Sequence, residues 1–183
     1  MTRVFIGGSR RIGRLTADVR RRLDAIIAQY LPVLVGDANG ADKAVQQYLH
    51  SRAYERVEVF CSGGRCRNNL GAWPVRAVPV EGRRRGFGFY AAKDKVMAEE
   101  ATVGLMIWDG ASIGTLMNML RLLRQQKKVA VYVSPIGAFE DLHRETDLDA
   151  LVSHHAPELR ERLERESYTE QRAAESRRQA SLI

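Results

Sequence analysis

The chain has 183 residues, of which 45% are hydrophobic, so it is long enough for one domain with a proper core and some additional structure. Its net charge of +7 permits polyanionic partners, nucleic acid included, and fits equally well a pocket for a phosphorylated small molecule. No apolar run approaches the roughly 20 residues of a membrane-spanning helix, and the N-terminus lacks the pattern of a signal peptide. Cys61 and Cys66 are too few for a disulfide scaffold and lack the second pair that a zinc site needs. We therefore expect a cytoplasmic protein without membrane contact, metal or cofactor.

Apolar runs and helical patterns alternate along the chain. Continuous apolar runs, which indicate buried strands, lie at 3–7, 32–36, 56–60, 103–108 and 128–133. Apolar residues at helical spacing lie between them at 15–30, 39–49, 89–101 and 114–126. Strands that are apolar on both faces and alternate with helices favour a parallel sheet covered on both sides. The predicted fold class is therefore α/β, a Rossmann-like doubly wound sheet of about five mainly parallel strands with helices on both faces, followed by a C-terminal helical tail.

Two regions fall outside this alternation. Residues 61–88 are rich in Gly, Asn and Arg, and we expect an irregular loop insertion there with a short strand near 75–80. The arginines at 83–85 are interpreted as a solvated loop, the alternatives being a lid over a phosphorylated ligand or a contact to nucleic acid. From Phe139 onward the chain is expected to be helical and increasingly charged. We place a Rossmann-like domain at 1–153 and a charged helical tail at 154–183, interpreted as a solvated helix or, alternatively, a dimer contact.

Three strand-to-helix junctions carry small and hydroxyl-bearing residues. They are GGSRR at 7–11, GDANGAD at 36–42 and DGASIGT at 109–115. Ligands of open parallel sheets lie outside the carboxyl ends of the strands, so these loops meet at one edge. Glycines let the backbone approach a ligand, and helix N-termini offer unpaired N–H groups that suit phosphate. Each loop alone can be ordinary turn chemistry, but together they favour a nucleotide-sized pocket without a dinucleotide-dehydrogenase or Walker motif.

Charged side chains in and near these loops have a structural interpretation and at least one functional interpretation. Asp37, Asp42 and Asp109 either cap helices, or bind ribose hydroxyls, or do nucleophilic or acid–base work at an anomeric carbon. Lys93 and Asp94 lie on the helix that leads into the strand before the third loop. They form either a surface pair or a site at which Lys93 reaches a ligand phosphate.

These motifs resemble the SLOG superfamily, Rossmann-like proteins that bind nucleotides or nucleotide-derived ligands. The matching stretches are GSR after the first strand, GDANGADKAVQQYL, FYAAKDKVMA and MIWDGASIGTLMNML. They extend from Val4 to Val133, apart from the loop after Phe60, and are most similar to the branch related to YspA and cpYpsA. The superfamily also contains LOG phosphoribohydrolases, which cleave the N-glycosidic bond of cytokinin nucleotides, and related nucleoside hydrolases and deoxyribosyltransferases.

The resemblance implies nucleotide binding more strongly than it implies hydrolysis. It aligns Gly114 and Thr115 with the Gly-Thr pair of the LOG loop and puts Asn118 where the catalytic Glu of LOG proteins would be, while Lys93 falls near the LOG arginine. An asparagine can hydrogen-bond a ribose but cannot act as a carboxylate nucleophile or general base. A catalytic carboxylate would have to come from positions 37, 42, 94 or 109, and the candidates we select are Asp109 and Asp42.

The expected function is therefore a sensor or effector domain that binds a nucleotide or an ADP-ribose-like ligand. The alternatives are a nucleotide hydrolase of the phosphoribohydrolase or N-glycosidase type, which uses an Asp in place of the LOG Glu, and a nucleic-acid binder that uses the basic loop. Related proteins are often dimers, and we expect a homodimer. The predicted ligand-binding residues are Gly8, Ser9, Arg10, Gly36, Asp37, Gly40, Ala41, Asp42, Lys93, Asp94, Asp109, Gly110, Ser112, Gly114, Thr115 and Asn118.

Overall fold

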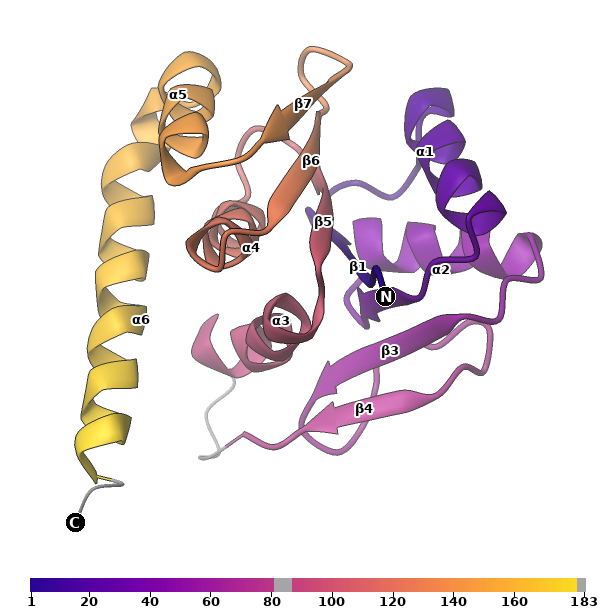
Figure 1. Ribbon diagram of the computed structural model, residues 1–183, viewed down its shortest axis with the longest axis horizontal. Helices are drawn as coiled ribbons and strands as arrows, with labels where there is room; N and C mark the ends of the chain where they lie inside the picture. The colour runs from indigo at the N-terminus through magenta and orange to yellow at the C-terminus, as the bar shows by residue number, and fades with distance from the viewer. Residues whose placement is uncertain (81–86, 181–183) are drawn as a thin grey trace.

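Seven strands form one sheet in the computed structural model, which describes residues 1–80 and 87–180 (Figure 1). The strands are β1 Val4–Gly8, β2 Val33–Gly36, β3 Val57–Ser62, β4 Val75–Val78, β5 Val103–Trp108, β6 Lys128–Val133 and β7 Ala138–Leu142. Their order is β4-β3-β2-β1-β5-β6-β7, and neighbouring strands are parallel except for the antiparallel pair β6–β7. The predicted fold class, an α/β Rossmann-like sheet, is confirmed.

Helices cover both faces of this sheet. They are α1 Ala17–Ala28, α2 Ala41–Ser51, α3 Phe87–Glu100, α4 Ile113–Arg124, α5 Glu145–His155 and α6 Arg160–Ala180, with the 3-10 turn η1 Pro157–Leu159 before α6. Helices α1 and α2 pack on one face and α3 and α4 on the other, while α5 and α6 pack on the outer side of α4 (Figure 1). In the described part of the chain, no helix is long and apolar enough to cross a membrane.

Strand β1 shows why the central strands are apolar throughout. Val4 and Ile6 belong to the core beneath α1 and α2, whereas Phe5 belongs to the core beneath α3 and α4. Successive side chains of a strand point to opposite faces, and here both faces are covered by helices. A strand in this position therefore reads as a continuous apolar run rather than as an alternating one.

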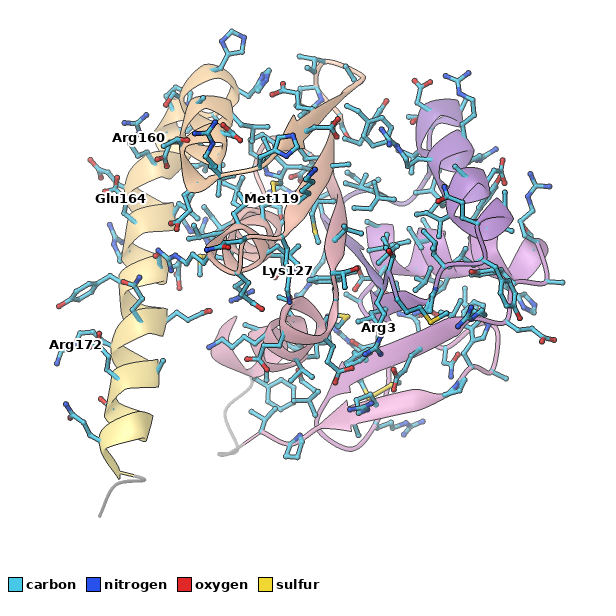
Figure 2. All side chains as sticks on the ribbon, in the orientation of Figure 1. Arg3, Met119, Lys127, Arg160, Glu164 and Arg172 are labelled. Carbon is cyan, nitrogen blue, oxygen red and sulfur yellow. A yellow bond between two sulfur atoms is a disulfide. The ribbon has the colours of Figure 1, made fainter. Side chains whose placement is uncertain are left out.

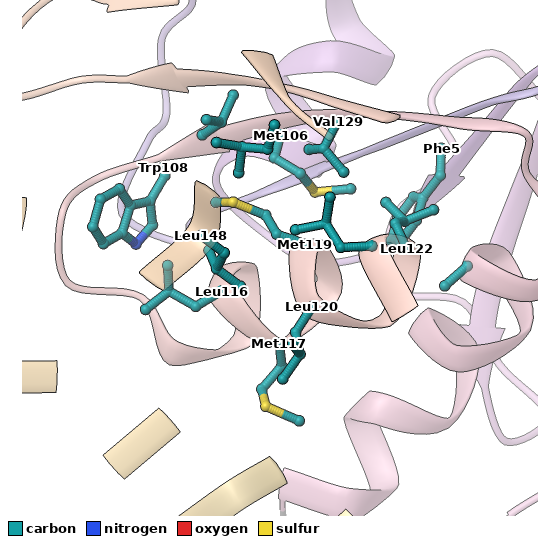
Figure 3. Packing of buried hydrophobic residues seen from close by; sticks show 14 of the residues in the cluster. Phe5, Met106, Trp108, Leu116, Met117, Met119, Leu120, Leu122, Val129 and Leu148 are labelled. Atoms are coloured by element: carbon teal, nitrogen blue, oxygen red, sulfur yellow. The ribbon is translucent and has the colours of Figure 1, made fainter. Parts of the chain in front are cut away.

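Helix α4 is enclosed by its own chain. Ten of its twelve residues are buried, and Met119 and Leu122 pack in one cluster with Met106 and Val129 of the sheet and Leu148 of α5 (Figure 3). The sequence of α4 is apolar on more than one face because α3, α5 and α6 surround it. Its pattern therefore does not require a dimer partner, and the homodimer stays a prediction.

The region 61–88 is more regular than expected. Strand β3 continues to Ser62, the expected short strand forms β4 at the edge of the sheet, and α3 already begins at Phe87. Cys61 and Cys66, considered above only as scaffold or zinc residues, form a disulfide with their Cα atoms 5.2 Å apart. The arginines at 83–85 lie outside the described residues, so their proposed roles stay predictions.

Strand β7 is the second difference from the sequence analysis. The expectation that the chain is helical from Phe139 onward is wrong for its first residues, because Ala138–Leu142 pair antiparallel with β6. Gly137, at a φ of +65°, completes the tight turn that reverses the chain. Across the two strands the rings of Phe139 and Tyr132 lie 5.1 Å apart. Five residues with a single buried Leu142 give too short a period-two pattern to indicate a strand.

The tail is helical as expected, but its first half is not a solvated helix. Leu163 and Ser167 of α6 are buried, and α6 contacts α4. Glu164 and Arg172, in contrast, point away from the rest of the protein (Figure 2). The interpretation of the tail as a solvated helix is therefore wrong for the turns that carry the two buried residues.

We expect Leu163→Ala to lower the free energy of unfolding by about 2 kcal/mol, because it removes a buried side chain that packs between α6 and the α4 core. Urea denaturation measures the change. The matched control is Tyr168→Ala on the same helix, where a 60% exposed side chain should change stability by less than about 0.5 kcal/mol. Equal stability of Leu163→Ala and the wild type would contradict the packing of α6.

Candidate functional site

The site lies where the order of the sheet reverses. Strands β2, β3 and β4 lie on one side of β1, and the chain then crosses to β5 on its other side. Open α/β sheets bind ligands outside the carboxyl ends of the strands at such a switch point. A cavity of about 560 Å³, which we call the main cleft, opens there and is lined by the loops after β1 and β5 and by residues of α3, α4 and α6.

The main cleft brings together most of the predicted ligand-binding residues. Those that line it are Gly8, Ser9, Arg10, Asp42, Lys93, Asp94, Asp109, Ser112, Gly114, Thr115 and Asn118. The predicted residues outside its lining are Gly36, Asp37, Gly40, Ala41 and Gly110. Tyr90, Arg121 and Arg162 line it as well and were missed by the sequence analysis.

Gly36 and Gly40 lie outside the lining of the cleft but allow close contacts next to it. A Cβ at position 36 would overlap the carboxylate of Asp42 and the amino group of Lys93. Gly40 has a φ of +83°, and its Cα lies against the backbone of Arg10, an arrangement that disfavours any side chain. These glycines therefore let charged groups and a neighbouring loop approach the ends of the strands.

Asp109 joins the two central loops across the switch point. One of its carboxylate oxygens accepts the Ser9 hydroxyl at 2.6 Å, and the other accepts the N–H groups of Ala111 and Ser112 at 3.1 and 2.8 Å. Burial works to raise the pKa of Asp109, but these hydrogen bonds outweigh it and hold the pKa below its ordinary value. The carboxylate is therefore ionised at neutral pH and orders the loop that leads into α4.

The N-terminus of α4 faces the main cleft. Ser112 caps the helix, since its hydroxyl accepts the Thr115 N–H at 3.4 Å. At Gly114, the second residue of the helix, a Cβ would meet no atom within 4 Å. Helix N-termini carry partial positive charge and unpaired N–H groups, which attract anions. This wall of the cleft can therefore receive a phosphate group.

Lys93 is a buried cation at the edge of the main cleft. Its Nζ lies 2.6 Å from Asp94 Oδ1 and 3.8 Å from Asp42 Oδ2. Burial alone would lower the pKa of Lys93, but the two carboxylates outweigh it and raise the pKa, so the side chain stays charged. Burial raises the pKa of Asp42 to about 6, although Lys93 works to lower it. The interpretation of Lys93 and Asp94 as a pair on the protein surface is wrong for Lys93, whose side chain is buried and 4% exposed.

A chain of polar contacts runs from this ion pair to the tail. Asn118 Nδ2 donates to Asp94 at 3.3 Å, and its oxygen accepts Arg121 Nη1 at 2.5 Å. Arg121 then donates to both carboxylate oxygens of Glu170, from Nε at 2.9 Å and from Nη2 at 2.6 Å. Asn118 thus occupies the place that the resemblance gives to a catalytic Glu, and it is held between a carboxylate and a guanidinium.

Asp37 belongs to a neighbouring contact. Its carboxylate accepts the backbone N–H of Arg67 at 3.0 Å and the guanidinium at 2.7 and 3.0 Å. Burial works to raise the pKa of Asp37, but the hydrogen bonds from Arg67 outweigh it and lower the pKa. This carboxylate therefore fixes the loop after β3, next to the main cleft but outside its lining.

The fold and the cleft at its switch point define a Rossmann-like α/β protein. No protein-family model matches the sequence, and the search of curated proteins found no match. The fold is similar to that of DNA processing protein A from Helicobacter pylori, which has a described single-stranded DNA binding mode. The TM-score is 0.53 at 15% sequence identity, and the match covers 71% of this chain and 64% of that chain. At this identity the likeness concerns the fold, and the chain spans less than two thirds of that protein's length.

We expect Asp42→Asn to change how stability depends on pH. With a folded pKa of about 6 against an ordinary value of 3.8, Asp42 binds its proton more tightly in the folded protein than in the unfolded chain. The contribution of Asp42 is therefore most favourable below about pH 4 and is lost as the pH rises through about 6. The free energy of unfolding of the wild type relative to Asp42→Asn should fall by up to about 3 kcal/mol between pH 4 and 7.

Urea denaturation of both proteins across this pH range measures the difference. The control is Asp109→Asn, because the lowered pKa of Asp109 has the opposite sign: relative to this variant, the wild type should lose stability as the pH falls below 4. Parallel curves for the wild type and Asp42→Asn would show that burial does not raise the pKa of Asp42.

Proposed function

We propose that the protein binds a nucleotide or a nucleotide-derived ligand in the main cleft and acts as a sensor or effector domain. The observation that carries the proposal is the N-terminus of α4, which faces this cleft at the switch point of the sheet. The volume of about 560 Å³ falls within the range of small-molecule sites. The resemblance to the SLOG superfamily supports the same proposal.

The charges that line the main cleft favour an anionic ligand. The lining contains more cationic side chains than carboxylates. The five cations are Arg10, Arg11, Lys93, Arg121 and Arg162, and the three carboxylates are Asp42, Asp94 and Asp109. In the proposed complex the ligand phosphate lies at Ser112, Gly114 and Thr115, where hydroxyl and N–H donors are available. The side chain of Asp94 or Asn118 binds a ribose hydroxyl, and the guanidinium plane of Arg10, which lies over the Tyr90 ring, offers a surface for a base.

The carboxylates favour recognition over hydrolysis. Both oxygens of Asp109 already accept hydrogen bonds, and a lowered pKa makes a weak general base. Asp42 has a pKa near the range that acid–base catalysis uses, but Lys93 lies beside it. We therefore propose a binding protein and keep the nucleotide hydrolase as the alternative. Release of free base or phosphate from nucleotides, abolished in Asp109→Asn or Asp42→Asn, would establish the hydrolase.

Single-stranded nucleic acid is the second candidate ligand. It is favoured by the likeness in fold to a protein that binds single-stranded DNA and by the net charge of +7. Binding of this kind depends on phosphate contacts, so the affinity falls steeply as the salt concentration rises. Titrations at two salt concentrations, with a mononucleotide and with a longer strand, separate it from recognition of a small nucleotide.

We expect Gly114→Asp to weaken nucleotide binding strongly without loss of stability. The new carboxylate would lie at the helix N-terminus, where negative charge stabilises a helix but repels a ligand phosphate. Calorimetric titration with adenosine monophosphate, adenosine diphosphate and ADP-ribose should show an affinity at least about tenfold lower for the tightest binder, the equivalent of about 1.4 kcal/mol.

The matched control is Gly114→Ala, which adds only a methyl group to open space and keeps the backbone N–H. It should bind almost as the wild type does. In a thermal-shift assay the wild type should be stabilised by a ligand that binds the folded state, and Gly114→Asp should not. Equal binding by both variants would place the ligand elsewhere, and no binding of any member of the panel by the wild type would contradict the proposed function.

A further inference from the structure

A second cavity adjoins the main cleft. We call it the side pocket; it measures about 640 Å³ and is lined by the loop after β3, the start of α3 and Asp37 from the loop after β2. Its lining includes Arg65, Arg67, Phe89 and Tyr90. Tyr90 lines the main cleft as well, so the two cavities meet at this ring.

Tyr90 lies between arginines from two different loops. The guanidinium carbon of Arg10 lies 4.7 Å from the centre of the Tyr90 ring, and that of Arg67 lies 4.9 Å from it. Arg10 lines the main cleft and Arg67 the side pocket. Each cavity therefore has a cation beside the aromatic ring that they share, a combination that suits phosphate next to a stacked base.

Arg67, one of the two arginines of the side pocket, is held in position. Arg67 uses Nε and one Nη2 proton on Asp37, and a guanidinium has five N–H donors, so it can still donate to a ligand. Arg65 is exposed within the loop that the Cys61–Cys66 disulfide closes. Phe89 packs edge-on against Tyr90, with ring centres 5.2 Å apart, and adds a second aromatic surface.

We propose that the side pocket is a second nucleotide subsite, so that the two cavities together bind a ligand of two nucleotide units joined through phosphate. The inference rests on the proposed function of the main cleft. Each cavity has the volume of a site for one small molecule. A ligand that spans both would pass Tyr90, stack its bases on the guanidinium planes of Arg10 and Arg67 that cover this ring, and place its linking phosphate among Arg10, Arg65 and Arg67.

Calorimetric titration with adenosine monophosphate and with the 5′-phosphorylated dinucleotide pApA tests this proposal. The dinucleotide should bind at least about tenfold tighter, because a second base gains stacking and a second phosphate gains arginine contacts. Arg65→Gln and Arg65→Glu should lower the affinity for the dinucleotide by about threefold and tenfold, respectively, and leave that for the monophosphate unchanged. Arg65 is exposed, so both variants are expected to fold.

The control is Arg14→Gln, which removes an exposed arginine that lines neither cavity and should change neither affinity. Equal affinities for the two ligands in the wild type, or an equal loss of both in the Arg65 variants, would overturn the second subsite and leave the proposed function standing. Failure of both ligands to bind would overturn the second subsite, and the proposed function would be contradicted as well if adenosine diphosphate and ADP-ribose also failed to bind.

Titration with an oligoadenylate of eight units shows whether the two linked nucleotide units come from a free dinucleotide or from a segment of a single strand. An affinity equal to that of the dinucleotide indicates a free ligand of two units. An affinity that continues to rise with length indicates a segment of a single strand. In either case the loss in Arg65→Glu must persist, since the same subsite binds the second unit.

Discussion

The buried ammonium of Lys93 is the constraint around which the site is organised. A charge taken out of water destabilises a fold strongly unless it is paired, and Lys93 meets this condition through Asp94 on its own helix and Asp42 on α2. Gly36 has no side chain, and this leaves the space in which Lys93 and Asp42 approach each other. The start of α2, which follows the end of β2, and the middle of α3 are therefore held together by electrostatics at the place where the ligand is proposed to bind.

The same contacts divide the cleft into two kinds of wall. On one side, charged groups are linked from Asp42 through Asn118 to the tail, so their positions depend on one another. On the other side, the N-terminus of α4 presents Gly114, at which an added Cβ would meet open space. The wall of charged groups is preorganised, and the wall at the N-terminus of α4 is accessible. A binding site for a phosphorylated ligand needs both properties.

Local patterns predicted the fold well and the site only in part. The central strands are apolar on both faces, which distinguishes them in any sequence, whereas β7 has one buried residue, Leu142, and gives no such signal. Most residues of the cleft could be predicted, because they lie in loops that a parallel sheet must bring to one edge. Arg121 could have been found, since it lies three residues after Asn118 on one helix. Arg162 could not, because its place depends on how α6 packs against α4.

Asn118 is the neutral link between two charged side chains of the main cleft. Its amide is suited to its neighbours, because it donates to the carboxylate of Asp94 and accepts from the guanidinium of Arg121. A glutamate cannot do both: it would satisfy the arginine and face Asp94 with like charge. A glutamate at position 118 would therefore require a change of Asp94 at the same time.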